Sequence, residues 1–275
     1  TGVIIRQPAM NVPPTTIYLG LDLAWSERNP SGLAAAWGTP SGAHLIVRPH
    51  HLKTTAEIVA TIRATCGDAP AILAIDAPLL VPNETGRRLA EAELAAAFRQ
   101  YHAGPHPANR QLLRRYGGLR GEEIIAALAS DGFCYTPTIE SGGGGRLIVE
   151  VFPHPATIVL FGLPRILQYK ARPGRSLASR RHELRRYLDL LGSLIHANPP
   201  LIGVDRIWEK VDLSDTGATA LKAIEDEADA VLCAYIALYG HRWGAARCRS
   251  FGTVDGGAIF TPYWYEQKTP AAPIN

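Results

Sequence analysis

Cysteine and methionine are scarce in this sequence of 275 residues, and long apolar runs are absent. The four cysteines are Cys66, Cys134, Cys233 and Cys248. They form no C-x-x-C pair, which argues against a zinc ribbon, a thioredoxin-like redox site and a disulfide framework. No apolar run approaches the ~18 residues needed to span a bilayer, and residues 1–14 lack the pattern of a signal peptide. The sequence therefore predicts a cytoplasmic protein without a membrane partner.

Several common catalytic motifs are missing as well. The chain contains no G-x-x-x-x-G-K-[ST] phosphate loop, no G-x-S-x-G nucleophile elbow and no G-x-G-x-x-G dinucleotide turn. What the sequence does have is apolar content, because 47% of its residues are hydrophobic and only 19% are charged. That composition is typical of a globular protein with a large core and one or two domains.

The net charge of +3 conceals a local concentration of basic residues. Residues 165–186 hold eight Lys or Arg side chains and one acid, Glu183, whereas acids outnumber bases in the rest of the chain. Such a segment indicates an anion-binding face. The alternative is a solvated helix face in an arginine-rich protein, since the chain has 23 Arg and 5 Lys.

The first part of the chain has the pattern β-β-β-α-β. Apolar runs rich in strand-forming residues predict strands over 17–25, 32–38, 43–48 and 71–77. Between the last two, residues 54–66 have helical periodicity, and Thr54 with Glu57 forms a capping-box pattern at its start. The turn signals between the first three strands are short, which predicts an antiparallel meander.

The rest of the domain is predicted to be mainly helical. Residues 79–146 read as a helical insertion, with helices over 87–101, 109–116 and 121–130. We expect a strand over 146–152, helices over 176–196 and 219–239, and a hairpin over 251–260. The domain would span 15–262, followed by a C-terminal tail at 263–275. Residues 1–14 would form an N-terminal tail that is disordered or, if the native start is Met10, partly foreign to the protein.

Carboxylates occur where apolar strands should exclude them. Asp22 and Glu150 interrupt predicted strands, and Asp76 ends one. Burying an unpaired charge costs several kcal/mol, and no Lys or Arg lies beside these acids in their strands. A shared cation would neutralise their charge. Asp226 and Asp229 are three residues apart on a predicted helix, so they point the same way. Carboxylate oxygens select hard cations such as Mg²⁺ or Mn²⁺.

Four short motifs in a fixed order resemble a known family. GLDLAW (20–25), IDAP (75–78), VEVFPHP (149–155) and EDEADAVLCAY (225–235) resemble a family of unknown function described as predicted ribonuclease H-like nucleases. The order is also similar to that of Holliday-junction resolvases. The resemblance implies an α/β fold with a mixed five-stranded sheet and flanking helices. It implies metal ligands at Asp22, Asp76, Asp226 and Asp229, with Glu150 as a further catalytic acid of the narrower family.

The sequence thus predicts a Mg²⁺- or Mn²⁺-dependent nuclease with two ions, about 4 Å apart, that activate water and stabilise the leaving oxygen. The side chains expected to contact nucleic acid are Arg87, Arg88, Lys170, Arg172, Arg180 and Arg181. For Arg87 the alternative is an exposed ion pair with Glu91. Two other functions stay open: a non-catalytic nucleic-acid or protein-binding module on the same fold, and an actin-like ATP-binding phosphotransferase.

Overall fold

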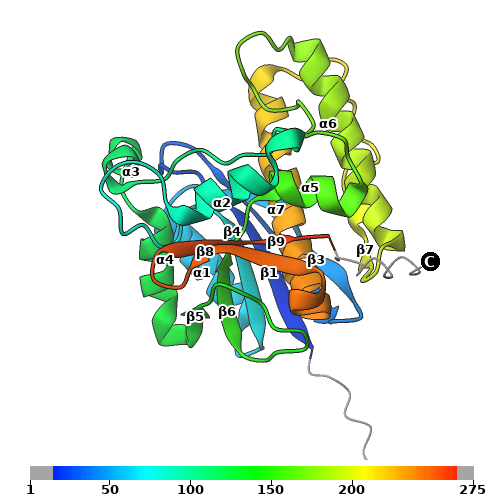
Figure 1. The fold of residues 1–275 in the computed structure, drawn as a ribbon. Coiled ribbons are helices and arrows are strands. Elements are labelled where there is room, and N and C mark those ends of the chain that lie inside the picture. Colours follow the sequence, from blue (N-terminus) through cyan, green and yellow to red (C-terminus); the bar gives the residue numbers. More distant parts are fainter. Residues whose placement is uncertain (1–14, 265–275) are drawn as a thin grey trace, which may run out of the picture.

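A mixed seven-stranded sheet forms the centre of the molecule (Figure 1). The computed structural model describes residues 15–264, so the predicted tail at 1–14 and most of the one at 263–275 lie outside the described residues. The strands are β1 (Thr16–Asp22), β2 (Ser31–Thr39), β3 (Gly42–Leu52), β4 (Ala71–Asp76), β5 (Phe133–Tyr135), β6 (Arg146–Glu150), β7 (Leu201–Ile202), β8 (Cys248–Thr253) and β9 (Gly257–Pro262). The helices are α1 (Thr55–Cys66), α2 (Leu89–Ala97), α3 (Arg110–Tyr116), α4 (Arg120–Leu128), α5 (Pro153–Phe161), α6 (Leu177–Gly192) and α7 (Ala218–Trp243).

The strand order of the sheet is β5-β6-β4-β1-β2-β3-β7. β1, β2 and β3 form the expected antiparallel meander, whereas β4 and β6 run parallel to β1. The carboxyl ends of β1, β4 and β6 therefore meet at one edge of the sheet. The prediction of five strands was wrong, because β5 and β7 were missed. They have three and two residues, which is too short for any periodicity to show in the sequence.

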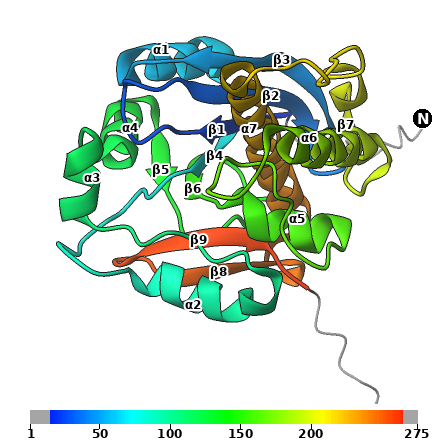
Figure 2. The same ribbon diagram turned by 90° about the horizontal axis from the view of Figure 1, so that it is seen from above.

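Each face of the sheet is covered by helices. α1 and α4 pack on one face through apolar side chains such as Ile58, Ile62 and Ile124. The capping box of Thr54 and Glu57 at the start of α1 is confirmed by hydrogen bonds in both directions. The other face is covered by α7, which contacts β1, β2, β3 and β4. α6 lies against α7 on its outer side (Figures 1 and 2).

α7 lies unusually close to the strands, and two glycines permit this. A Cβ atom at Gly20 of β1 would be 2.0 Å from the carbonyl oxygen of Ala230, and one at Gly32 of β2 would be 2.3 Å from that of Asp226. Both atoms belong to the backbone of α7, so they have no rotamer through which to move away. The close approach holds the acidic part of α7 directly against the ends of β1 and β2.

The segment between β4 and β6 is only partly a separate insertion. α4 packs on α1 and contributes to the main core, and β5 joins the sheet edge. α2 instead packs on the two-stranded sheet of β8 and β9, where Phe98, Phe251 and Ile259 form a small core (Figure 2). Tyr263, which was assigned to the C-terminal tail, also packs on Phe98.

Helix α5 was not predicted. Pro153 directly follows the predicted strand over 146–152 and occupies the first turn of α5. Proline is well suited to that position, because the first N–H groups of a helix have no partner within it.

Within residues 15–264, no helix is long and apolar enough to cross a membrane.

Candidate functional site

Asp22 and Asp76 lie side by side at the ends of β1 and β4. The two residues are paired in the parallel register, so their side chains leave the same face of the sheet. That face is the one covered by α7, because Gly20, two residues before Asp22, packs on Ala230. No hydrogen bond or ion pair from residues 15–264 reaches either carboxylate, since the nearby lysines bond to other acids. Two adjacent carboxylates therefore lack a partner.

The environment of this pair disfavours negative charge. Both side chains keep some contact with solvent, but the dense protein around them desolvates the carboxylates. Desolvation raises the pKa of Asp22 well above its ordinary value, and the neighbouring Asp229 and Asp76 carboxylates raise it further. The pKa of Asp76 is raised to about 7 by desolvation and by neighbouring acids such as Asp229, against the opposing effect of Lys170. A bound cation would relieve this repulsion.

Lys170 brings one positive charge to the cluster. Its Nζ lies 2.8 Å from Oδ2 of Asp229. The other oxygen of Asp229, Oδ1, accepts hydrogen bonds from the hydroxyls of Tyr169 at 2.8 Å and Tyr187 at 3.0 Å. Burial would raise the pKa of Asp229, but Lys170 and these bonds lower it below its ordinary value. The pKa of Lys170 is raised, because Asp229, Asp22 and Asp76 outweigh its desolvation. Asp229 has an exposed fraction of 0%, and both of its carboxylate oxygens lie within 3.0 Å of these partners.

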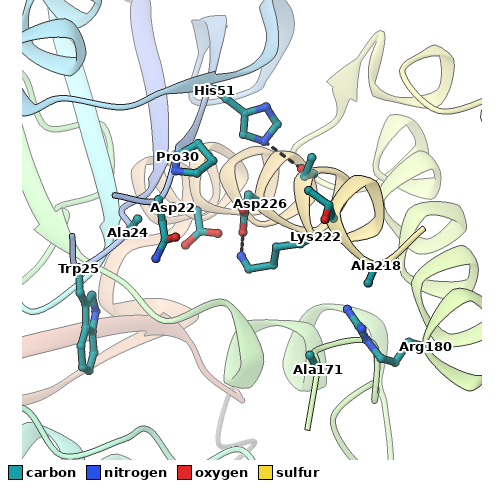
Figure 3. Close-up of a pocket in the computed structure, with 13 residues that line it drawn as sticks. Asp22, Ala24, Trp25, Pro30, His51, Ala171, Arg180, Ala218, Lys222 and Asp226 are labelled. Atoms are coloured by element: carbon teal, nitrogen blue, oxygen red, sulfur yellow. Dashed lines mark hydrogen bonds and ion pairs between the residues drawn. The ribbon is translucent and has the colours of Figure 1, made fainter. Parts of the chain in front are cut away.

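Lys222 forms the second ion pair of the cluster, with Asp226 one turn later on α7. Asp22 and Asp226 border the same cavity, which has a volume of about 690 Å³. Figure 3 shows Lys222 reaching Asp226 close to Asp22, with Arg180 and Trp25 at the two sides of the view. A second cavity of about 230 Å³ is lined by Asp22, Asp76, Lys170 and Trp25 among others. Asp22 therefore borders both cavities, and Asp76 borders the smaller one.

Glu150 lines the smaller cavity together with Asp22 and Asp76, but its carboxylate is held by partners of its own. It is in register with Ile75 and not with Asp76, so the alternation along the strand separates it from the face that carries Asp76. Its Oε2 accepts hydrogen bonds at 2.9 Å from Arg88 Nη1 and from the backbone N–H of Leu79. Arg88 also bonds to Glu91. Burial raises the pKa of Glu150, although Arg88 opposes it.

The basic residues assigned to nucleic acid fall into two groups. Arg88 is buried against Glu150, and Arg180 donates to Glu225 and to the carbonyl of Tyr169, each within 3 Å. These two guanidinium groups are therefore bound to partners inside the protein. The positions of the residues along the chain gave no indication of these partners. Arg181 is half-buried and donates to the carbonyl of Thr216. The members that remain exposed are Arg87 and Arg172.

A closed cage for two metal ions is not formed. No group of three or more His, Cys, Asp or Glu side chains among residues 15–264 is arranged to hold a metal ion. Lys170 and Lys222 take up charge on Asp229 and Asp226 that a second ion would otherwise neutralise. The residues do fit one ion of the Mg²⁺ type, which binds through one or two carboxylates and keeps several waters. Asp22 and Asp76 provide such a pair.

Three residues of the site, Lys222, Tyr169 and Tyr187, were not predicted from the sequence. For Lys222 a signal existed, because a lysine four residues before Asp226 on a helix is placed to form an ion pair. No local pattern could have assigned the two tyrosines to Asp229, since Tyr169 is 60 residues away from it in the chain.

Comparison with known proteins supports a family but no activity. Residues 20–252 match the family model described as "Protein of unknown function (DUF429)". No curated protein and no solved structure matches the chain significantly. The matched region runs from β1 to β8 and includes the carboxylate cluster. On this match, the chain belongs to the DUF429 family of proteins of unknown function.

Proposed function

We propose that this protein is a metal-dependent phosphodiesterase that cleaves nucleic acid and has a ribonuclease H-like arrangement. The observation that carries the proposal is the pair of unpartnered carboxylates, Asp22 and Asp76, at the ends of adjacent parallel strands. Two such groups, desolvated and close together, form a site for a divalent cation. Both border the smaller cavity, and Asp22 also borders the larger one, so substrate can reach them.

The order of the elements supports the ribonuclease H-like part of the proposal. An antiparallel meander of β1, β2 and β3 is followed by α1 and by β4, parallel to β1, and a late helix brings further acids to the same edge. Because one fold can serve many functions, cleavage is inferred from the site and not from this topology.

One Mg²⁺ or Mn²⁺ ion would be held by Asp22 and Asp76, with Asp226 beside them, and waters and a phosphate oxygen would complete its shell. When bound, such an ion acts as a Lewis acid toward the phosphoryl group and lowers the pKa of water. Lys170 supplies a fixed positive charge beside the carboxylates. Asp229 positions Lys170, and its own orientation is fixed by Tyr169 and Tyr187.

The test is cleavage of single-stranded, duplex and branched DNA or RNA in Mg²⁺ or Mn²⁺. We expect cleavage to be lost in Asp22→Asn and in Asp76→Asn. The matched control is Asp68→Asn, because Asp68 is exposed and precedes β4, at the other end of the strand. Equal activity in all variants would contradict the proposal. Binding without cleavage by the unmodified chain would favour a non-catalytic module, and hydrolysis of ATP would favour the actin-like alternative.

A further inference from the structure

The basic segment 165–186 is mostly engaged within the protein. Five of its eight cationic side chains make an ion pair or donate to a backbone carbonyl outside the segment. These are Lys170 with Asp229, Arg180 with Glu225, Arg181 with the Thr216 carbonyl, Arg185 with the Val211 carbonyl, and Arg186 with Glu183. Of the remaining three, Arg175 donates to the carbonyl of Lys170 at 3.0 Å. Arg165 and Arg172 are exposed, and neither makes an ion pair or a side-chain hydrogen bond with residues 15–264.

The three remaining arginines converge on one cavity. Arg165, Arg172 and Arg175 line a space of about 250 Å³, together with His102, Ile166 and Gln168. No acidic side chain lines it. The pKa of Arg175 is lowered by burial and by the guanidinium of Arg172, so the arginines are close enough to repel one another. The nearest acid, Glu183, lies outside the lining and is held by Arg186 and by the backbone N–H of Gln168. Three arginines around a cavity that no acid lines are the chemistry of an anion site.

This arginine pocket adjoins the carboxylate cluster. Three consecutive residues line three different cavities: Lys170 lines the one with Asp22 and Asp76, Ala171 lines the one with Asp22 and Asp226, and Arg172 lines the arginine pocket. A ligand held by Arg172 therefore binds to the same short segment that places Lys170 beside the carboxylates. An extended, repeatedly charged ligand could reach both places.

We propose that Arg165, Arg172 and Arg175 form a subsite for a phosphate group of the nucleic acid strand that is cleaved at Asp22 and Asp76, an inference that rests on the proposed function. Guanidinium groups match phosphate because their planar N–H donors bond two oxygens at once. The subsite holds the strand by its backbone and reads no base. It gives a role to Arg165 and Arg172, which make no ion pair and no side-chain hydrogen bond with residues 15–264, and to Arg175 beside them.

The experiment measures binding of a fluorescent single-stranded oligonucleotide in EDTA, where no metal-dependent cleavage can occur. The variant is Arg165→Gln/Arg172→Gln, which leaves the internal bond of Arg175 intact. The control is Arg48→Gln/Arg206→Gln, two exposed arginines elsewhere with the same change in charge. We expect the affinity of the variant to fall about tenfold or more, and its salt dependence to weaken by about 0.7 in slope for each phosphate that the arginines no longer bind. The control should change affinity less than about twofold.

Each outcome supports or overturns the subsite. Equal losses of affinity in variant and control, or no binding by the unmodified chain, would overturn it. If only oligonucleotides with a 5′-phosphate bind the variant more weakly, the subsite takes a terminal phosphate, and if all do, it takes an internal one. Cleavage that persists with unchanged binding in the arginine variant refutes this inference alone. Arginine-dependent binding without any cleavage refutes only the nuclease. Circular dichroism checks that the variants, altered at exposed positions, are folded.

Discussion

Replacing Arg88 by methionine should destabilise the protein strongly, because Arg88 neutralises two buried acids. The exposed fractions of the Arg88 and Glu150 side chains are 2% and 3%, and Glu91 is equally buried. Methionine fills a similar volume but leaves both carboxylates without their cation. Breaking a buried ion pair from one side costs about 3–5 kcal/mol. For a chain of this size, such a loss lowers the melting temperature by about 6–20 °C.

The same substitution should make stability more dependent on pH. Burial already raises the pKa of Glu150, while Arg88 opposes that rise. Without Arg88 the pKa rises further, so the folded state of the variant binds a proton that the unfolded state releases. Stability therefore increases as the pH falls, down to the ordinary pKa of a glutamate, about 4.3. The destabilisation by Arg88→Met should be larger at pH 8 than at pH 5.

Urea denaturation followed by tryptophan fluorescence at both pH values measures these effects. The matched control is Arg87→Met, since Arg87 is the exposed neighbour and makes no ion pair within residues 15–264. Adding Glu150→Gln to Arg88→Met should restore part of the lost stability, because it removes one of the two uncompensated charges. A loss below about 1 kcal/mol, or an equal loss at pH 5 and pH 8, would refute the internal role assigned to Arg88.

Three further predictions concern the carboxylate cluster. Asp76→Asn should stabilise the metal-free protein by about 1–3 kcal/mol at pH 8 and much less at pH 5. The pKa of Asp76 is raised to about 7, so its ionisation opposes folding increasingly as the pH rises from the ordinary aspartate pKa, about 3.9, to about 7. An unchanged melting temperature at pH 8 would contradict this. Gly32→Ala should lower the free energy of unfolding by about 1–3 kcal/mol and weaken Mn²⁺ binding, since the added methyl displaces the α7 backbone at Asp226. Urea denaturation checks the first effect and calorimetric titration the second, and unchanged values in both would contradict the close packing. Lys170→Met should tighten Mn²⁺ binding by about tenfold while lowering stability, because it removes a competing cation from Asp229. Electron paramagnetic resonance measures the free Mn²⁺, and weaker binding by the variant would refute this reasoning.

Local patterns in the sequence were sufficient to predict most of the longer strands and helices. Alternating and helical apolar periodicity located the meander, α1, β4, β6 and the long helices, because side-chain burial repeats with the period of the backbone. The capping box at Thr54 and the hairpin of β8 and β9 followed from turn and cap chemistry that involves only neighbouring residues. The positions of Asp22 and Asp76 in apolar strands also marked the candidate site before any spatial neighbour was known.

The partners of the acids could not be found in the same way. Glu150 has no base beside it in its own strand, yet Arg88, 62 residues earlier, neutralises it. Lys170 similarly reaches Asp229 from a segment between helices. A sequence shows which charges need a partner, because the surrounding apolar residues indicate burial. It does not show which distant side chain provides one, because that depends on how loops return to the sheet.

The sequence by itself determined the order of the longer strands and helices, without β5, α5 and β7. It also determined the edge of the sheet where acids gather and the basic character of residues 165–186. Only the tertiary structure decided which of those charges cancel inside the fold and which stay free. It separated Asp22 and Asp76, which have no partner among residues 15–264, from Glu150 and Asp229, which do. The physical reason is that electrostatic pairing depends on distance in space, and chain spacing constrains that distance only within a helix turn or a pair of neighbouring strands.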